Sequence, residues 1–320
     1  MTDRRMNKGY GMYVWMFAVP LFWGGAFGAA QHVISEIPPI TAAALRFGAA
    51  SLLLIFITQL RGEWQLAELR KRWRGLILMA VTGIFAYNAF FFYGLSYTSA
   101  INGSLIMANS PVFITLGAVL FLKEAWNRKL GLGLLLSLSG VVLVIINGSW
   151  ETLASFTLNA GDLLFLAALF CWVLYGLLGK VVMKGVSPLL TTTVTTAIGS
   201  FFLIFWSLFE DGWRQVPHLS AQAWAEMAYM TLFATVLAFF LWNQGVHHLG
   251  ASKASIYMNL VPINACWIAV LLYGAQMTWI QGVGICMVIA GVCTVTLSPG
   301  SRPRPSVSGP SIGPSRETGA

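Results

Sequence analysis

Residues 100–113 read AINGSLIMANSPVF, and residues 251–264 read ASKASIYMNLVPIN. A shift of 151 positions aligns the two stretches without a gap. It pairs Ala100 with Ala251, Ser104 with Ser255, Met107 with Met258 and Pro111 with Pro262. Such an ordered set is harder to obtain by chance than matching glycines, because apolar helices resemble one another in composition. The two stretches therefore predict an internal duplication.

The duplication extends on both sides of these stretches. The same shift pairs Gly94 with Gly245, Leu120 with Leu271, Gly131 with Gly282, Gly133 with Gly284 and Gly140 with Gly291. Towards the N-terminus, a shift of 149 positions pairs Trp23 with Trp172 and Pro39 with Pro188. We expect the repeats to cover residues 11–147 and 159–297.

The composition indicates a membrane protein. Hydrophobic residues make up 57% of the 320 residues and charged residues only 9%, whereas soluble domains carry about 25% charged residues. The net charge of +8 is spread between apolar runs, so it does not form the clustered basic face of a nucleic-acid-binding protein. The lipid bilayer is the expected partner, and nucleic acid is not.

Ten apolar runs are long enough to cross a bilayer as helices of about 20 residues. The first five are Gly11–Gln31, Ile40–Leu60, Trp73–Leu95, Thr98–Leu122 and Leu130–Ile146. The second five are Asp162–Val182, Leu189–Phe209, Ala223–Val246, Ser252–Tyr273 and Thr278–Leu297. Residues 1–10 precede them, and the Ser-, Pro- and Gly-rich residues 298–320 are expected to be disordered.

Continuous apolar runs favour helices over a β-barrel, whose strands alternate in hydrophobicity. A repeat of five helices forces its second copy to insert upside down. The predicted fold is thus an all-α integral membrane protein with about ten transmembrane helices, arranged as two inverted five-helix repeats, as in many secondary transporters. A pseudo-two-fold axis in the membrane plane should relate the repeats.

The basic residues are segregated between the two sets of connections that these spans define. One set, with the termini, holds Arg4, Arg5, Lys8, Arg61, Arg70, Lys71, Arg72, Arg74, Lys123, Arg128, Lys129, Lys180, Lys184, Lys253, Arg302, Arg304 and Arg316. The other set holds only Arg214. Because cytoplasmic loops carry the excess of Lys and Arg, both termini are expected to lie in the cytoplasm, with the protein in the cytoplasmic (inner) membrane.

Several short motifs add a family resemblance. In the first half they are Phe22-Trp23-Gly24, Ala44-Leu45-Arg46-Phe47, Asn109-Ser110-Pro111-Val112-Phe113 and Leu122-Lys123-Glu124. In the second half they are Gly161-Asp162-Leu163, Cys171-Trp172, Leu241-Trp242-Asn243 and Pro262. With them, residues 12–297 resemble the ten-helix EamA-like exporters of the drug/metabolite transporter superfamily, and are most similar in character to bacterial amino-acid exporters.

The resemblance implies export of small organic metabolites. The sequence departs from the family's pattern at Gly274-Ala275, where such proteins often carry Gly-Glu, whose Glu is the counterpart of Glu124. A structural consequence is expected from this departure. The first span also lacks the central carboxylate of the distantly related small multidrug antiporters, which disfavours proton-for-cation exchange by that route.

The sequence offers no catalytic or metal-binding constellation inside the apolar runs. The acids on the expected outer side are Glu36, Glu151, Asp162, Glu210, Asp211 and Glu226, and Asp162 and Glu226 are expected to meet helix N-termini. The four cysteines show no metal-ligand spacing. We therefore expect neither an enzyme nor a bound metal or cofactor.

Arg46 is the one strong base clearly within a span, about 10 Å from the end of its helix at 1.5 Å per residue. A buried guanidinium must face a cavity or find partners. A structural role and a role in the pathway both remain open for it.

Polar and aromatic residues within the spans are the candidates for a solute pathway, because organic solutes need hydrogen-bonding groups and flat apolar walls. The candidates are Trp23, Tyr87, Met107, Ala108, Trp172, Asn243, Tyr257 and Asn259. Trp23 and Trp172 are favoured because they are repeat-equivalent. Met107 and Ala108 precede Pro111, and proline bends a helix at a hinge or pathway.

These observations predict a secondary transporter or facilitator that exports small organic metabolites such as amino acids by alternating access. A central cavity is expected between helices one, three, four, six, eight and nine. Two alternatives stay open at this point, an integral-membrane enzyme acting on a lipid or headgroup and a membrane receptor or scaffold. The sequence does not fix the oligomeric state, and a monomer is compatible with it.

Overall fold

The computed structural model describes the chain except for residues 1–10, 99, 147–158, 265–266, 269–277 and 297–320. The described part is all-α, without a β-strand. Nine of its helices are long and apolar enough to cross a membrane. The predicted span Ser252–Tyr273 falls partly outside the described residues, as do both terminal tails, Glu151 and the Gly274-Ala275 pair. The predicted all-α membrane fold is confirmed.

After a short helical stretch at residues 11–15, the described part of the first half contains eight further helical elements. They are α2 (Ala18–Glu36), α3 (Pro39–Leu60), α4 (Leu66–Met79), η1 (Ala80–Ala86), α5 (Tyr87–Tyr97), α6 (Ala100–Met107), α7 (Ser110–Leu122) and α8 (Arg128–Ile146). The first span continues towards the N-terminus to Gly11, and α4, η1 and α5 form one span from Leu66 to Tyr97.

The second half repeats this order. Its elements are α10 (Ala160–Val182), α11 (Pro188–Ser207), η2 (Gly212–Arg214), η3 (Val216–His218), α12 (Ala221–Thr231), η4 (Leu232–Leu237), α13 (Ala238–Leu249), α14 (Ala251–Ser255), η5 (Ile256–Leu260) and α16 (Trp279–Thr296). The elements α12, η4 and α13 form one span from Ala221 to Leu249.

The third span begins at Leu66, earlier than the predicted Trp73. Hydropathy detects only the apolar part of a helix, whereas Leu, Ala, Glu, Lys and Arg also favour helix in a polar environment. Lys71 donates a hydrogen bond to Glu68 at 2.8 Å, one turn away, which supports the polar start of this helix. The span therefore continues as a basic helix beyond its apolar run.

The two halves share local irregularities that regular helices lack. The segments η1 and η4 are both π-helical and occupy nearly the same place in each repeat after the shift of 151 positions. The main chain also breaks at Ala108 and Asn109, between α6 and α7, and tightens to a 3-10 helix in η5. Both breaks directly precede the paired prolines, as the prolines predict.

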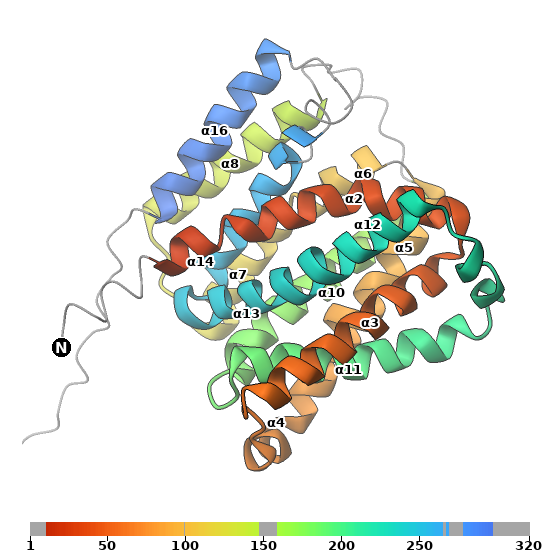
Figure 1. The fold of residues 1–320 in the computed structure, drawn as a ribbon. Helices are drawn as coiled ribbons and strands as arrows, with labels where there is room; N and C mark the ends of the chain where they lie inside the picture. The colour runs from red at the N-terminus through yellow and green to blue at the C-terminus, as the bar shows by residue number, and fades with distance from the viewer. Residues whose placement is uncertain (1–10, 99, 147–158, 265–266, 269–277, 297–320) are drawn as a thin grey trace, which may run out of the picture.

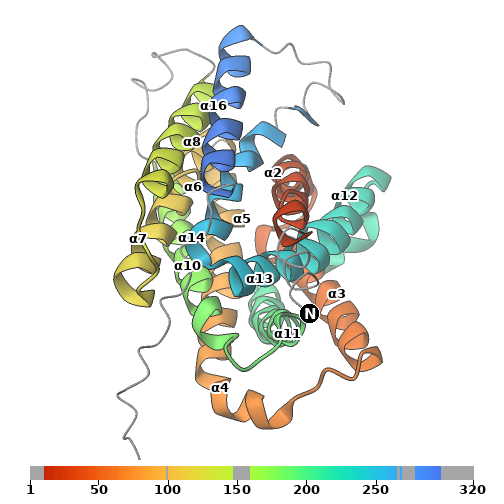
Figure 2. The ribbon, with the colours of Figure 1, turned by 90° about the vertical axis from the view of Figure 1, so that its left-hand side faces the viewer.

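Corresponding helices of the two halves pack against each other. Figure 1 shows α8 beside α16 and α3 beside α11, and both pairs are in contact. In Figure 2, α2 and α12 lie on one side of the molecule and α7 and α8 on the other, with α10 beside α7, and α10 and α7 are in contact. The contact of α2 with α12 has its counterpart in the contact of α10 with α4, and the contact of α2 with α13 has its counterpart in the contact of α10 with α5. This pattern is the one that two related halves would give.

Glycines set the closest of these contacts. A Cβ added to Gly140 would lie 2.5 Å from the carbonyl oxygen of Gly284, and one added to Gly284 would lie 2.7 Å from that of Gly140. Gly133 and Gly291 approach each other in the same reciprocal way, at 2.7 and 2.6 Å. Since α8 and α16 meet antiparallel and through repeat-equivalent glycines, the interface supports the predicted inversion, which remains a prediction.

Carboxylates near the helix ends hold helix N-termini. Glu210 accepts hydrogen bonds from the backbone N–H groups of Ile40 and Thr41 at the start of α3. Glu124 accepts from Ala251 and Ser252 at the start of α14. Such contacts satisfy donors that have no partner within the helix.

Of the two acids predicted to cap helices, Asp162 does so and Glu226 does not. Asp162 forms a reciprocal capping box with Asn159 at the start of α10. Glu226 instead contacts His32 at 2.6 Å. The reason is that α12 begins at Ala221, where the hydroxyl of Ser220 accepts from the N–H of Ala223, so Glu226 lies beyond the first turn.

Candidate functional site: an aromatic cluster with a buried arginine

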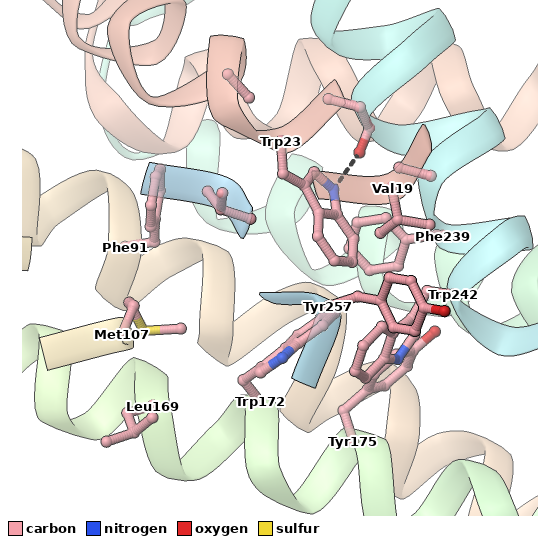
Figure 3. Packing of buried hydrophobic residues seen from close by; sticks show 14 of the residues in the cluster. Val19, Trp23, Phe91, Met107, Leu169, Trp172, Tyr175, Phe239, Trp242 and Tyr257 are labelled. Atoms are coloured by element: carbon pink, nitrogen blue, oxygen red, sulfur yellow. Dashed lines mark hydrogen bonds between the residues drawn. The ribbon is translucent and has the colours of Figure 1, made fainter. Parts of the chain in front are cut away.

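The repeat-equivalent tryptophans meet at the centre of the molecule. Trp23 of α2 and Trp172 of α10 lie edge to face, with ring centroids 5.2 Å apart. Trp242 of α13 completes a triangle, 5.9 Å from Trp23 and 5.0 Å from Trp172. Figure 3 shows these rings around Phe239, which contacts Trp23 at 5.7 Å and Trp172 at 5.9 Å. Pairs at these separations attract beyond their burial of apolar surface.

The π-helix η4 fixes the position of Trp23. A π-helical turn widens the main chain and changes the hydrogen bonding of its carbonyls. The indole Nε1–H of Trp23 donates to the Ala234 carbonyl at 2.9 Å (Figure 3). The hydroxyl of Thr235 donates to the Met230 carbonyl five residues earlier, at 2.9 Å. Trp23 is therefore held by a hydrogen bond as well as by ring contacts.

Arg46 of α3 binds the same segment. Its Nε donates to the hydroxyl of Thr235 at 2.7 Å, and one of its terminal nitrogens donates to the Ala234 carbonyl at 3.2 Å. Only 5% of the residue is exposed. One oxygen thus accepts from both Arg46 and Trp23, which places the guanidinium beside the aromatic cluster.

Tyr87 closes the other side of this group. It is the first residue of α5, directly after the π-helix η1. Its ring centroid lies 5.3 Å from that of Trp172. Four residues singled out from the sequence, Trp23, Tyr87, Trp172 and Arg46, are therefore brought together from four helices.

Met107 and Ala108 lie at the break between α6 and α7. Both are buried, at 7% and 6% exposure. In Figure 3, Met107 and Leu169 lie to one side of the tryptophans, below Phe91. Both side chains belong to the buried hydrophobic core that also contains Trp23 and Trp172.

Asn243, Tyr257 and Asn259 are also buried. Their hydrogen bonds join them to residues other than Trp23, Tyr87, Trp172 and Arg46. Asn243 donates to the hydroxyls of Tyr175 and Thr192 at 2.9 and 2.8 Å. Tyr257 donates to the Tyr13 carbonyl at 3.1 Å, and Asn259 donates to Ser137 at 2.7 Å. Both amides therefore face protein, where their N–H groups are hydrogen-bonded.

Some central residues were missed by the sequence analysis. Trp242, Phe239, Tyr175 and Thr235 all contact the cluster or Arg46. One signal was available, because Trp242 is paired with Phe91 by the shift of 151 positions. No signal pointed to Thr235, whose role depends on the π-helical geometry of η4.

The acids of the described residues stay away from this site. Glu36, Glu63, Glu124, Asp162 and Glu210 bind groups at helix ends. No group of three His, Cys, Asp or Glu side chains suited to a metal occurs within the part of the chain that the structure describes. The centre therefore combines aromatic rings with one cation, an arrangement suited to binding a solute rather than to bond-breaking chemistry.

Comparisons with known proteins match most of the chain. The model of the EamA-like transporter family matches residues 11–146 and 159–297. The uncharacterized transporter YyaM of Bacillus subtilis is 36% identical over 289 residues, which cover 90% of this chain and 94% of that protein. An uncharacterized transporter of Archaeoglobus fulgidus is 30% identical over 277 residues, covering 86% of this chain and 94% of that one.

A solved crystal structure shares the fold. It superposes with a TM-score of 0.73 at 18% identity and covers 90% of this chain and 98% of its own. At this identity the likeness concerns the fold alone. The two stretches matched by the family model coincide with the two predicted repeats, which further supports the duplication.

Proposed function

The chain belongs to the EamA-like transporter family, and from that premise we propose that it exports small organic metabolites, amino acids among them, through the aromatic cluster. Family membership makes the protein a multi-pass membrane transporter and not an enzyme. The choice of amino acids rests on the resemblance of its motifs to bacterial amino-acid exporters.

One observation carries the proposal of the site. Trp23 and Trp172, which occupy the same position in the two repeats, lie in ring contact 5.2 Å apart. Repeats that rock about a central axis expose such a pair alternately to the two sides of the membrane. The pair, together with Tyr87 and Arg46, forms the proposed solute site. Met107, Ala108, Asn243, Tyr257 and Asn259 extend the proposed pathway around it.

The proposed location is the cytoplasmic membrane, with both termini in the cytoplasm. Contacts gather basic residues at one end of the helices, in line with this orientation. Lys180 donates to the carbonyls of Val246 and His247, and Lys253 reaches the hydroxyl of Tyr13. Lys71, Arg72 and Arg74 line a pocket with Leu178 and Val181 on the helix that carries Lys180.

Reconstitution of the protein into liposomes tests the function. Amino acids, purines, sugars and amines are loaded one at a time, and the loss of each solute is compared with that from protein-free liposomes. We expect amino acids to leave faster when the protein is present. If no solute leaves faster, the proposed export function is contradicted.

Substitution of the paired tryptophans tests the site. Trp23→Ala and Trp172→Ala should each lower the flux about tenfold, the factor that corresponds to about 1.4 kcal/mol of lost interaction. Trp15→Ala is the matched control, because Trp15 lies in the same span as Trp23 and is 63% exposed. Normal flux in both cluster variants, with correct folding, would remove the site and leave the family assignment intact.

A further inference from the structure

We propose that Arg46 binds the carboxylate of the transported solute, so that the protein selects organic acids and zwitterions over amides and amines. This inference rests on the proposed function, since it concerns the solute of the same site. It adds a chemical class of ligand and a residue that determines specificity.

The positive charge of Arg46 is buried and has no carboxylate partner in the described part of the chain. Arg46 is 5% exposed and lies within a membrane span. Among the described residues, no carboxylate forms an ion pair with it, since the ion pairs found there involve only His32 and Lys71 as cations. Isolated charge in a low-dielectric interior is costly, and an opposite charge lowers that cost. A solute carboxylate would supply the missing negative charge.

Arg46 and two neighbouring tryptophans also have N–H donors without an acceptor in the described part of the chain. A guanidinium has five N–H donors, and the hydrogen bonds within the described part of the chain account for one from Nε and one from a terminal nitrogen. The indole N–H groups of Trp172 and Trp242 are also buried without an acceptor in that part. An indole N–H can only donate. The unpaired polar groups of Arg46, Trp172 and Trp242 are therefore all donors, which suits a ligand rich in acceptors.

Two hydrogen bonds hold the side chain of Arg46 inside the membrane span. A lysine or arginine that snorkels extends its charge to the membrane surface. Arg46 instead binds Thr235 and Ala234 of η4, next to Trp23. The hydrogen bonds to η4 use two of the N–H donors of Arg46, and they leave its positive charge unneutralised. The ring of Phe47, with its centroid 4.9 Å from the guanidinium carbon, adds a cation–π contact but no negative charge. A purely structural role therefore leaves the positive charge of Arg46 without a counterion.

The surroundings indicate the shape of the solute. Arg46 offers one cation, whereas Trp23, Tyr87 and Trp172 offer aromatic surface next to it. A solute that fits both has a carboxylate at one end and an apolar or aromatic body. An amine without a carboxylate would meet a cation of like charge, and an amide would bring no charge to neutralise Arg46.

The inference is tested first on the unaltered protein in detergent and in liposomes. The probes are L-phenylalanine, L-leucine and benzoate, each compared with its carboxamide, together with phenethylamine. Binding is followed by tryptophan fluorescence and transport by counterflow. We expect at least one acid to bind about 10- to 100-fold more tightly than its amide, the range for a hydrogen bond to a charged group.

Variants of Arg46 test whether this residue causes the preference. Arg46→Gln should lower acid binding about 10- to 100-fold and so remove the preference for the acid over its amide. Arg46→Lys keeps the charge but not the planar fork, so it should keep part of the preference. Arg74→Gln is the control, because it removes an exposed positive charge away from the centre. Gel filtration and thermal unfolding show which variants fold.

The outcomes separate the two proposals. Equal binding of acids and amides, an unchanged preference in Arg46→Gln, or no binding of any acid would overturn the role of Arg46. Should neutral solutes still be transported in a manner sensitive to Trp23→Ala, the proposed function would survive that failure. If Arg46→Gln does not fold, the comparison of acid with amide in the unaltered protein and in Arg46→Lys decides the question.

Discussion

The Ala234 carbonyl shows how one backbone group organises the centre. It accepts from Trp23 at 2.9 Å and from Arg46 at 3.2 Å, so a residue of α12–α13 positions side chains from α2 and α3. Movement of η4 would therefore move an aromatic wall and a cation together. Such shared positioning is what keeps a binding site in a defined geometry.

Substitution of Asn243 measures how much a single buried amide contributes to the free energy of unfolding. Asn243→Leu leaves the hydroxyls of Tyr175 and Thr192 without their donor, and we expect the free energy of unfolding to fall by about 1–2 kcal/mol. Thermal unfolding in detergent measures it. Gln244→Leu is the matched control, because within the described residues this neighbouring amide binds only the exposed His248. Equal stability of both variants would show that the hydrogen bonds of Asn243 carry little weight.

Among the helical elements, the two π-helices η1 and η4 have the most direct bearing on the proposed site. Both π-helical segments adjoin the site, since Tyr87 follows η1 directly and η4 carries Ala234 and Thr235. π-Helical turns occur often at functional positions because they change backbone hydrogen bonding locally. The paired helix breaks before Pro111 and Pro262 place two further irregular points in equivalent helices.

The α8–α16 interface gives a prediction at the scale of elements. Gly284→Ala would place a Cβ 2.7 Å from the Gly140 carbonyl oxygen, and such overpacking typically costs about 1–3 kcal/mol. Gly282→Ala is the control in the same helix, since its Cβ would meet nothing within 4 Å, and alanine favours helix by about 0.5–1 kcal/mol. Thermal unfolding should therefore rank Gly282→Ala above the unaltered protein and Gly284→Ala below it. The reverse order would contradict the close contact.

For the whole molecule, the sequence was sufficient for the fold class and for most spans. Apolar runs mark the membrane-crossing parts of helices, and the shift of 151 positions already pairs the glycines of the α8–α16 contact. The polar start of α4 and the partner of Glu226 were not predictable in this way. Both depend on where a helix begins in a polar environment, which hydropathy does not report.

The site was predictable only in part, for a related reason. Trp23 and Trp172 could be paired because they repeat in the sequence. The contact of Arg46 with Thr235 could not, because it joins residues 189 positions apart through a π-helical turn. Hydrogen bonds of this kind follow from packing and leave no periodic pattern.

Orientation is a property of the whole molecule and can be measured directly. In a variant whose four native cysteines are replaced by alanine, a cysteine added within residues 298–320 should be protected from a membrane-impermeant thiol reagent in intact cells, because the basic connections are expected to face the cytoplasm. A cysteine at Arg214 should react. The opposite labelling of the two positions would reverse the proposed topology.

The central claim is that a solute binds between the repeats at the aromatic cluster. An experimental structure with a solute identified in the liposome screen tests it most directly. The account predicts that the body of the solute contacts Trp23 and Trp172 and that its carboxylate lies within hydrogen-bonding distance of Arg46. A solute bound elsewhere, with Trp23 and Trp172 still packed against each other and Arg46 away from it, would contradict the account.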